Sequence, residues 1–410
     1  MHSVTETSTG IFTRRTIAAF SVEAVTSISA NLLLQGFFFY ATGVFHWSRE
    51  QSFTLAAGEG IVYILGALAA NLLAARFGRR RSLMLLQSIM LALTTASALC
   101  PTPKIVFAVL LGYSMTSAAQ WPNLEGLVSS GVDAHLLSRR IGVYNLFWSG
   151  TNALTTAAVG TLIVHLGGGL FWIPVLLHAS AMAILLAVRL PAEAPSGHPE
   201  PPPALKRQRR LAMQLSRIAL PSTYTVLYAL IPMLPTLPVV LSFGPEMQTV
   251  VASVWMVARF LAFLILGATV WWHTRPRLLL LAAVVMLAGY LGVVLRPADF
   301  AGHSASPVTA LDQWSMILSQ IVLGFSLGLI YAGSLYFGMA LSSGSVEHGG
   351  YHEALIGLGQ VIGPGAGVLA EQFASGNPTA VVASVGGVIT LSIVAAAGVT
   401  IRDGFSAHTQ

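Results

Sequence analysis

Leu111-Gly112-Tyr113-Ser114 in the first half of the chain returns as Leu323-Gly324-Phe325-Ser326 in the second half. The similarity continues to Gly160 in one copy and to Gly367 in the other. Four pairs share one offset of 207 residues: Gly142 and Gly349, Tyr144 and Tyr351, Gly150 and Gly357, and Gly160 and Gly367. A repeat that involves about half the chain predicts two structurally equivalent halves.

Between their matching ends, the two copies differ in polarity. Residues 120–125 read Gln-Trp-Pro-Asn-Leu-Glu, whereas residues 332–337 read Ala-Gly-Ser-Leu-Tyr-Phe. The scaffold therefore repeats and its polar insert does not. This contrast indicates that the functional site involves the polar insert.

The composition predicts a polytopic membrane protein. Of the 410 residues, 55% are hydrophobic and 9% are charged, whereas about a quarter of the residues of a soluble protein are charged. The net charge of +6 does not indicate nucleic-acid binding, because the basic residues fall between apolar runs. Cys100 is the only cysteine, so the chain has no internal disulfide and no cysteine spacing for a metal. The apolar stretch after Arg14-Arg15 is too long for a cleaved signal and is expected to stay as the first span.

Twelve segments are apolar over the roughly 20 residues that a spanning helix needs. They are 17–45, 51–75, 82–100, 104–131, 140–165, 169–189, 218–243, 248–272, 278–296, 313–341, 350–373 and 378–401. Arginine and lysine concentrate before the first span, after the last one and in every second loop between them. By the positive-inside rule, both termini are predicted to be cytoplasmic.

One long polar break divides the chain into six spans and six spans. We expect an N-terminal half at 1–190, a flexible cytoplasmic linker at 191–217 and a C-terminal half at 218–410. The linker carries Pro199 to Pro203 and then Lys206-Arg207-Gln208-Arg209-Arg210. These basic residues are interpreted as an orientation signal, with contact to anionic lipid headgroups as the alternative.

The loop after the second span carries a family resemblance. Ala74-Ala75-Arg76-Phe77-Gly78-Arg79-Arg80 resembles the signature Gly-x-Leu-Ala-Asp-Arg-x-Gly-Arg-Arg/Lys of the major facilitator superfamily (MFS). Asn71 stands at the opening glycine and Ala75 at the aspartate, so the acidic member of that charge cluster is missing. The resemblance implies an all-α membrane fold with 12 transmembrane helices in two six-helix halves. It also implies alternating access to a site between the halves.

A second likeness concerns the run from Gly359 to Gly365, which is similar to the glycine-proline element that drug/proton antiporters place in span five. Here it lies in span eleven, while span five reads Gly150-Thr151-Asn152-Ala153-Leu154. This placement weakens the drug-exporter interpretation. Close helix packing is the favoured explanation for these glycines.

Polar residues inside predicted spans are candidate site residues, because a charge at the bilayer centre costs at least about 2.5 kcal/mol. The substrate-binding candidates are Asn31, Gln120, Trp121, Asn123, Glu125, Asn152, Tyr228, Arg259, Tyr331 and Gln360. The coupling or gating candidates are Glu23, Glu59, His352, Glu353, Arg76, Arg79 and Arg80. Trp121 and Glu125 share a helix face, and Pro122 frees a carbonyl that protein or cavity water must satisfy, which favours cavity lining.

Three roles stay open at this point. Arg259 either forms a structural pair with Glu59 or Glu125, which is the expectation, or binds an anionic solute. His352 and Glu353 either relay protons or lie near water at the start of a helix. Glu59 and Glu23 are alternative proton carriers.

The predicted function is secondary active transport of a small organic solute across the bacterial inner membrane, with proton coupling as one option. The alternatives are a drug or metabolite efflux antiporter and a non-transporting receptor of the same fold. An enzyme is not expected, because the sequence lacks a His-rich metal motif, a Ser-His-Asp set and a phosphate loop. The expected partners are the substrate and membrane lipids, with the chain as a monomer and without metal, cofactor or nucleic acid.

Overall fold

The computed structural model describes residues 10–129, 134–188, 203–300, 306–342, 346–374 and 378–408, and these ranges contain helices and no strand. The all-α architecture is therefore confirmed. The helices of the first half are α1 (Arg14–Asn31), η1 (Leu32–Gly36), α2 (Phe37–Gly43), α3 (Arg49–Phe77), α4 (Arg79–Leu99), α5 (Pro103–Ser129), α6 (Ala134–Leu166), η2 (Gly167–Phe171) and α7 (Trp172–Ala187). Those of the second half are α8 (Pro203–Met233), η3 (Leu234–Thr236), α9 (Pro238–Leu241), α10 (Pro245–Ala252), α11 (Val254–Ala268), η4 (Trp271–Thr274), α12 (Leu278–Val294), α13 (Pro297–Phe300), α14 (Ala310–Ser342), α15 (Val346–Phe373) and α16 (Pro378–His408).

Nine helical stretches in the described ranges are long and apolar enough to cross a membrane. One of them, 136–187, contains two of the predicted spans, which meet at the 3₁₀ turn η2. Each of the twelve predicted segments is helical over most of its described length. The number of crossings stays a prediction.

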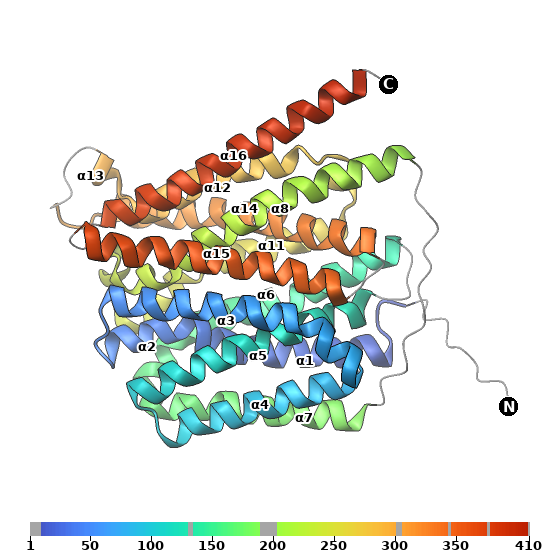
Figure 1. Ribbon diagram of the computed structural model, residues 1–410. Coiled ribbons are helices and arrows are strands. Elements are labelled where there is room, and N and C mark those ends of the chain that lie inside the picture. Colours follow the sequence, from blue (N-terminus) through green and yellow to red (C-terminus); the bar gives the residue numbers. More distant parts are fainter. Residues whose placement is uncertain are drawn as a thin grey trace.

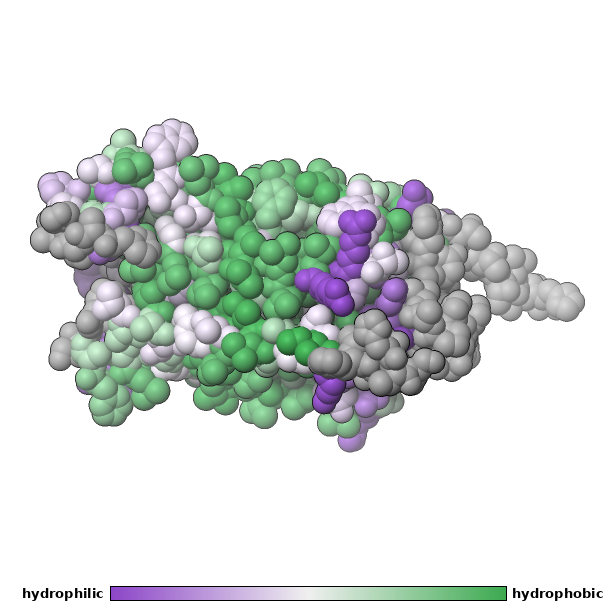
Figure 2. All heavy atoms as spheres, turned by 90° about the horizontal axis from the view of Figure 1, so that it is seen from above, coloured by the Kyte–Doolittle hydropathy of each residue, from purple (hydrophilic) through white to green (hydrophobic). Residues whose placement is uncertain are grey.

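The surface suits a lipid environment. Figure 2 shows hydrophobic side chains over the middle of the molecule, with hydrophilic side chains gathered toward one end. Large apolar side chains such as Leu72, Leu154 and Leu391 are exposed on α3, α6 and α16. In a bilayer these side chains would face hydrocarbon.

Long helices run side by side through the bundle, and α1 begins at the end of the bundle where α16 finishes (Figure 1). We call this the terminal end.

The linker prediction was wrong in part, because α8 already begins at Pro203. Residues 204–211 are mostly alanine, leucine, lysine, arginine and glutamine, which are good helix formers. Arg207 of this extension pairs with Asp403 of α16 at 3.1 Å.

Orientation can be tested by labelling. Cysteines introduced at Ser196 and Ser304, in a chain whose exposed Cys100 is replaced by serine, are expected to react from opposite sides of intact cells. Both positions lie outside the described residues, and the expectation rests on the distribution of cations. Labelling of both cysteines by an impermeant reagent would contradict the predicted topology.

The two halves meet along two equivalent helix contacts. Helix α15 packs along α3, and α6 packs along α10 and α11. The repeated glycines lie at these contacts. A Cβ atom on Gly142 would lie 3.0 Å from Gly267 Cα of α11, and one on Gly357 would lie 3.2 Å from Ile64 N of α3. The sequence repeat thus marks places where the two halves approach each other closely.

Other glycines of span eleven serve packing within the second half. Gly359 approaches Pro221 and Gly363 approaches Thr225, both on α8. A side chain at either glycine would collide with the α8 backbone. The packing explanation for the run from Gly359 to Gly365 is therefore supported at these two positions.

A buried polar network joins four helices of the first half. His178 Nδ1 lies 2.8 Å from Gln87 Oε1, and its Nε2 lies 2.8 Å from Ser29 Oγ and 3.0 Å from Tyr113 Oη. Gln87 Nε2 donates to Thr26 Oγ1 and to Gln120 Oε1, so its Oε1 must accept from His178. The imidazole therefore carries its proton on Nδ1 and accepts a hydroxyl proton at Nε2.

Replacing His178 by leucine is expected to destabilise the protein by about 1–3 kcal/mol, because it leaves Gln87 Oε1 without a donor inside a buried network. Thermal unfolding in detergent measures the loss. Ser180→Ala on the same helix is the control, since this exposed hydroxyl bonds only to the Leu176 carbonyl. Equal unfolding temperatures for His178→Leu and the native protein would show that the network does not support the fold.

Candidate functional site

A cavity of about 100 Å³ lies between the two halves. Its lining comes from α1, η1, α3, α5 and α6 on one side and from α8, α11, α14 and α15 on the other. The lining residues are Glu23, Ser27, Ala30, Asn31, Leu34, Gln35, Tyr63, Trp121, Tyr144, Trp148, Asn152, Tyr224, Leu227, Tyr228, Ile231, Arg259, Tyr331, Glu353 and Ile356. The π-helical turn η1 contributes Leu34 and Gln35, and such turns often occur at functional sites.

Arg259 is the cation of this cavity lining. Its side chain is 3% exposed, and its Cζ lies 4.5 Å from the ring centroid of Trp148 and 4.8 Å from that of Trp255. Its Nε has no hydrogen-bond partner, and no carboxylate of the described residues lies within 4.0 Å of the guanidinium. The expected ion pair with Glu59 or Glu125 is therefore not formed. Two indole faces stabilise the charge instead.

Two glycines of α14 allow this helix to pack closely against α11 at Arg259. A Cβ on Gly324 would lie 3.0 Å from Arg259 N, and one on Gly328 would lie 3.3 Å from Arg259 O. Glycines four residues apart let two helix backbones approach closely. Gly324 belongs to the repeated Leu-Gly-Phe-Ser sequence, so the repeat also positions the candidate site.

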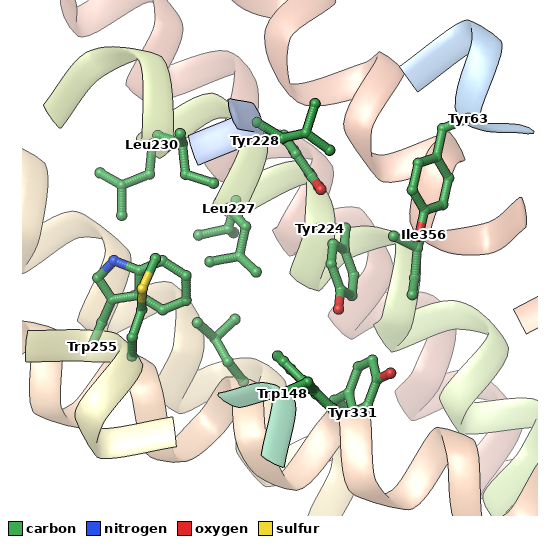
Figure 3. Packing of buried hydrophobic residues seen from close by; sticks show 14 of the residues in the cluster. Tyr63, Trp148, Tyr224, Leu227, Tyr228, Leu230, Trp255, Tyr331 and Ile356 are labelled. Atoms are coloured by element: carbon green, nitrogen blue, oxygen red, sulfur yellow. The ribbon is translucent and has the colours of Figure 1, made fainter. Parts of the chain in front are cut away.

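Aromatic side chains form one wall of the cavity. Trp148, Tyr224 and Tyr331 come from α6, α8 and α14 and lie close together (Figure 3). The Tyr331 ring centroid is 5.1 Å from that of Trp148 and 6.4 Å from that of Tyr224. Trp148 Nε1 donates to Asn145 Oδ1 at 3.0 Å, which fixes the indole plane against Arg259.

Amide and carboxyl groups line the cavity from the first half. Asn31 Oδ1 accepts from Thr156 Oγ1 at 2.7 Å, which leaves Asn31 Nδ2 without a partner. The side-chain amide of Asn152 can donate hydrogen bonds to the Trp148 and Ser27 carbonyls when its nitrogen is placed on their side. Glu23 Oε1 accepts from Ser27 Oγ at 2.9 Å, and its Oε2 has no partner. The cavity therefore offers unused donors and acceptors beside the guanidinium.

The structure brings together eight of the candidates from the sequence. Those that line the cavity are Asn31, Trp121, Asn152, Tyr228, Arg259, Tyr331, Glu23 and Glu353. They come from seven helices and from both halves. Their roles in binding or coupling remain predictions.

Other candidates point away from the cavity. Gln120 bonds to Gln87 within the first half, and Asn123 Nδ2 donates to the Ala119 carbonyl of its own helix. Gln360 lies where α15 crosses Gly60 of α3, and its side-chain amide has no partner. Glu59, the residue before Gly60, is also buried, with neither carboxylate oxygen bonded. These residues belong to helix contacts.

Glu125, His352 and Glu353 form a buried cluster beside the cavity, which Glu353 also lines. One ligand atom from each lies within 4.8 Å of the other two. Tyr63 Oη donates to Glu353 Oε2. The alternative that His352 and Glu353 lie near water was wrong, because α5 and α3 of the other half cover this part of α15.

The basic residues of the signature lie at the terminal end. Gly78 has φ +75°, a conformation that favours glycine, and it joins α3 to α4. Arg79 packs against Gly126 of α5, while Arg80 Nη2 donates to the Leu185 carbonyl of α7 at 3.2 Å. Arg76 is exposed beside Phe77. None of the three arginines lines the cavity.

The sequence prediction missed several lining residues, among them Tyr63, Tyr144 and Tyr224. Tyr224 precedes Tyr228 by four residues, so the two share a helix face, and this spacing could have indicated it. Tyr144 was recognised only as a repeated residue. Nothing in the local sequence distinguishes Tyr63 from a lipid-facing tyrosine.

Comparison with known families agrees with this arrangement. A sequence model of the Major Facilitator Superfamily matches residues 16–364. The chain belongs to the major facilitator superfamily. It is thus an integral, multi-pass membrane transporter of the MFS fold. No curated protein matches the chain as a relative.

Proposed function

We propose that this MFS protein is a secondary active transporter that carries a small organic anion by alternating access. The observation that carries the proposal is Arg259, a buried cation that lines a cavity between the halves and has no carboxylate partner among the described residues. A buried charge is costly unless it is paired. An anionic solute would supply the missing partner.

The guanidinium also suits the geometry of a carboxylate. Its planar fork can bind two oxygens at once, and such charge-assisted bonds are stronger than neutral ones. The aromatic wall beside it, with Trp148 and Tyr331, offers flat faces for the rest of the solute. An engineered cavity of about 150 Å³ holds benzene, so a cavity of about 100 Å³ suits a small solute in this form.

The contacts between the halves support alternating access. At the terminal end, Gly142 meets Gly267 and Gly349 meets Pro122. At the other end, α2 of the first half contacts η3 of the second half. Opening the cavity widely at either end would require the contacts at that end to separate, as rocking of one half against the other would allow.

Glu23 is the proposed coupling group, because it lines the cavity with a carboxylate oxygen that has no partner. An imposed pH gradient is expected to drive accumulation of the solute in proteoliposomes that contain the native protein. Glu23→Gln should lose this accumulation and keep exchange of labelled for unlabelled solute. Unchanged accumulation by the variant would contradict the role of Glu23.

Two steps test the proposed function. A ligand-stabilisation screen on purified protein, using small organic anions, cations and neutral solutes, is expected to select anions. Counterflow of the selected anion in proteoliposomes should then show exchange above that of empty vesicles. Binding without exchange would indicate a receptor and contradict transport.

A further inference from the structure

Three ligand-type side chains converge where the two halves meet. Glu125 comes from α5, whereas His352 and Glu353 are neighbours on α15. Glu125 and Glu353 are each 2% exposed and His352 is 3% exposed. Both carboxylate oxygens of Glu125 and Nε2 of His352 have no hydrogen-bond partner, although each lies close to the other members of the cluster.

The charges of this cluster are not balanced by protein. No arginine, lysine or histidine of the described residues forms an ion pair with Glu125 or Glu353 within 4.0 Å. Two adjacent buried carboxylates need positive charge between them. A proton held between the two carboxyl groups or a cation from outside the chain can supply this charge, and the unpartnered Nε2 of His352 beside them suits a metal ion.

Surrounding residues hold the three side chains in place. His352 Nδ1 lies 3.2 Å from Ser334 Oγ, which leaves Nε2 directed to the cluster. The Tyr63 hydroxyl donates to Glu353 Oε2 and leaves Oε1 available. Metal-binding histidines are commonly oriented in this way through their second ring nitrogen, and metal-binding carboxylates are hydrogen-bonded as well.

We propose that Glu125, His352 and Glu353 bind one divalent transition-metal ion, which joins the first half of the protein to the second. The imidazole nitrogen favours zinc or iron over sodium, magnesium or calcium, and the two carboxylates also suit manganese. Two carboxylates balance the charge of a divalent ion. At the largest separation of 4.8 Å, each ligand atom would lie about 2.8 Å from a central ion, so zinc-to-ligand distances of about 2.0–2.2 Å require each atom to move at least roughly 0.6 Å toward the ion.

The ion would stabilise the form in which the terminal end is closed, because Glu125 leaves the other two ligands when α5 separates from α15. Transport is then expected to be inhibited by the metal. The metal site does not depend on which solute is carried or on whether transport occurs.

The test uses the full chain, purified without a polyhistidine tag and stripped with a chelator. Calorimetry with zinc chloride and manganese chloride should show one ion bound per chain, with a higher unfolding temperature, and sodium and magnesium chloride should show neither. Glu125→Gln, His352→Gln and Glu353→Gln should each weaken binding by at least about tenfold. Glu59→Gln is the matched control, a buried carboxylate outside the cluster, and should bind as the native protein does.

X-ray absorption of the zinc-loaded native protein makes the test independent of variant folding. One imidazole and otherwise oxygen ligands are expected. The absence of divalent-ion binding, binding that persists in all three variants, or a site with several imidazoles would overturn the proposal.

Discussion

Arg259→Gln is expected to fold like the native protein and to lose most of its affinity for the anion. Removing one member of a buried charge pair costs about 2–5 kcal/mol, which corresponds to about 30-fold or more in the dissociation constant. Stability should change little, because Arg259 has no carboxylate partner to leave behind among the described residues. Calorimetry with the anion selected by the screen measures the affinity, and thermal unfolding measures stability.

Two further variants sharpen this result. Arg259→Lys keeps the charge and loses the planar fork, so its affinity should lie between those of the native protein and Arg259→Gln. Arg277→Gln, an exposed cation between α11 and α12, is the control and should bind normally. A folded Arg259→Gln variant with native affinity would remove Arg259 from the site.

Gly142→Leu is expected to stop transport by keeping the terminal end open. The leucine would meet the α11 backbone at Gly267, where a Cβ already lies 3.0 Å away. Overpacking costs about 1–3 kcal/mol, which shifts the equilibrium away from the closed form by about 5- to 150-fold. The fold should persist, because each half keeps its own core when the halves separate. Counterflow in proteoliposomes measures the loss.

The matched control is Gly387→Leu on α16, where an added Cβ meets no atom within 4 Å. This variant should transport at the native rate. If Gly142→Leu also transports at the native rate, the contact between α6 and α11 does not need to close during transport. Rocking about this contact would then be the wrong mechanism.

The sequence was sufficient for the architecture because its repeat and its apolar segments are long-range patterns. The repeated glycines, such as Gly142 and Gly349, had to be small at the contacts between the halves. Depth along a helix was also predictable by counting residues, which located Asn31, Arg259 and Tyr331 at the level of the cavity. The face of the helix was less predictable.

In a largely apolar helix, the sequence does not show which face contacts lipid and which contacts protein, because both surroundings accept apolar side chains. Gln120 has the right depth and turns toward Gln87 instead of the cavity. Asn123 turns back to its own helix. The cluster of Glu125 with His352 and Glu353 could not be found from spacing, since α5 and α15 belong to different halves and meet only in the folded protein.

The most direct test of the proposed transport uses a matched pair of solutes, the small carboxylate selected by the screen and its uncharged primary amide. Both are offered to proteoliposomes that contain the native protein. If the guanidinium of Arg259 binds the substrate, the carboxylate is exchanged and the amide is not. Equal exchange of the amide would contradict an anion transporter built around Arg259.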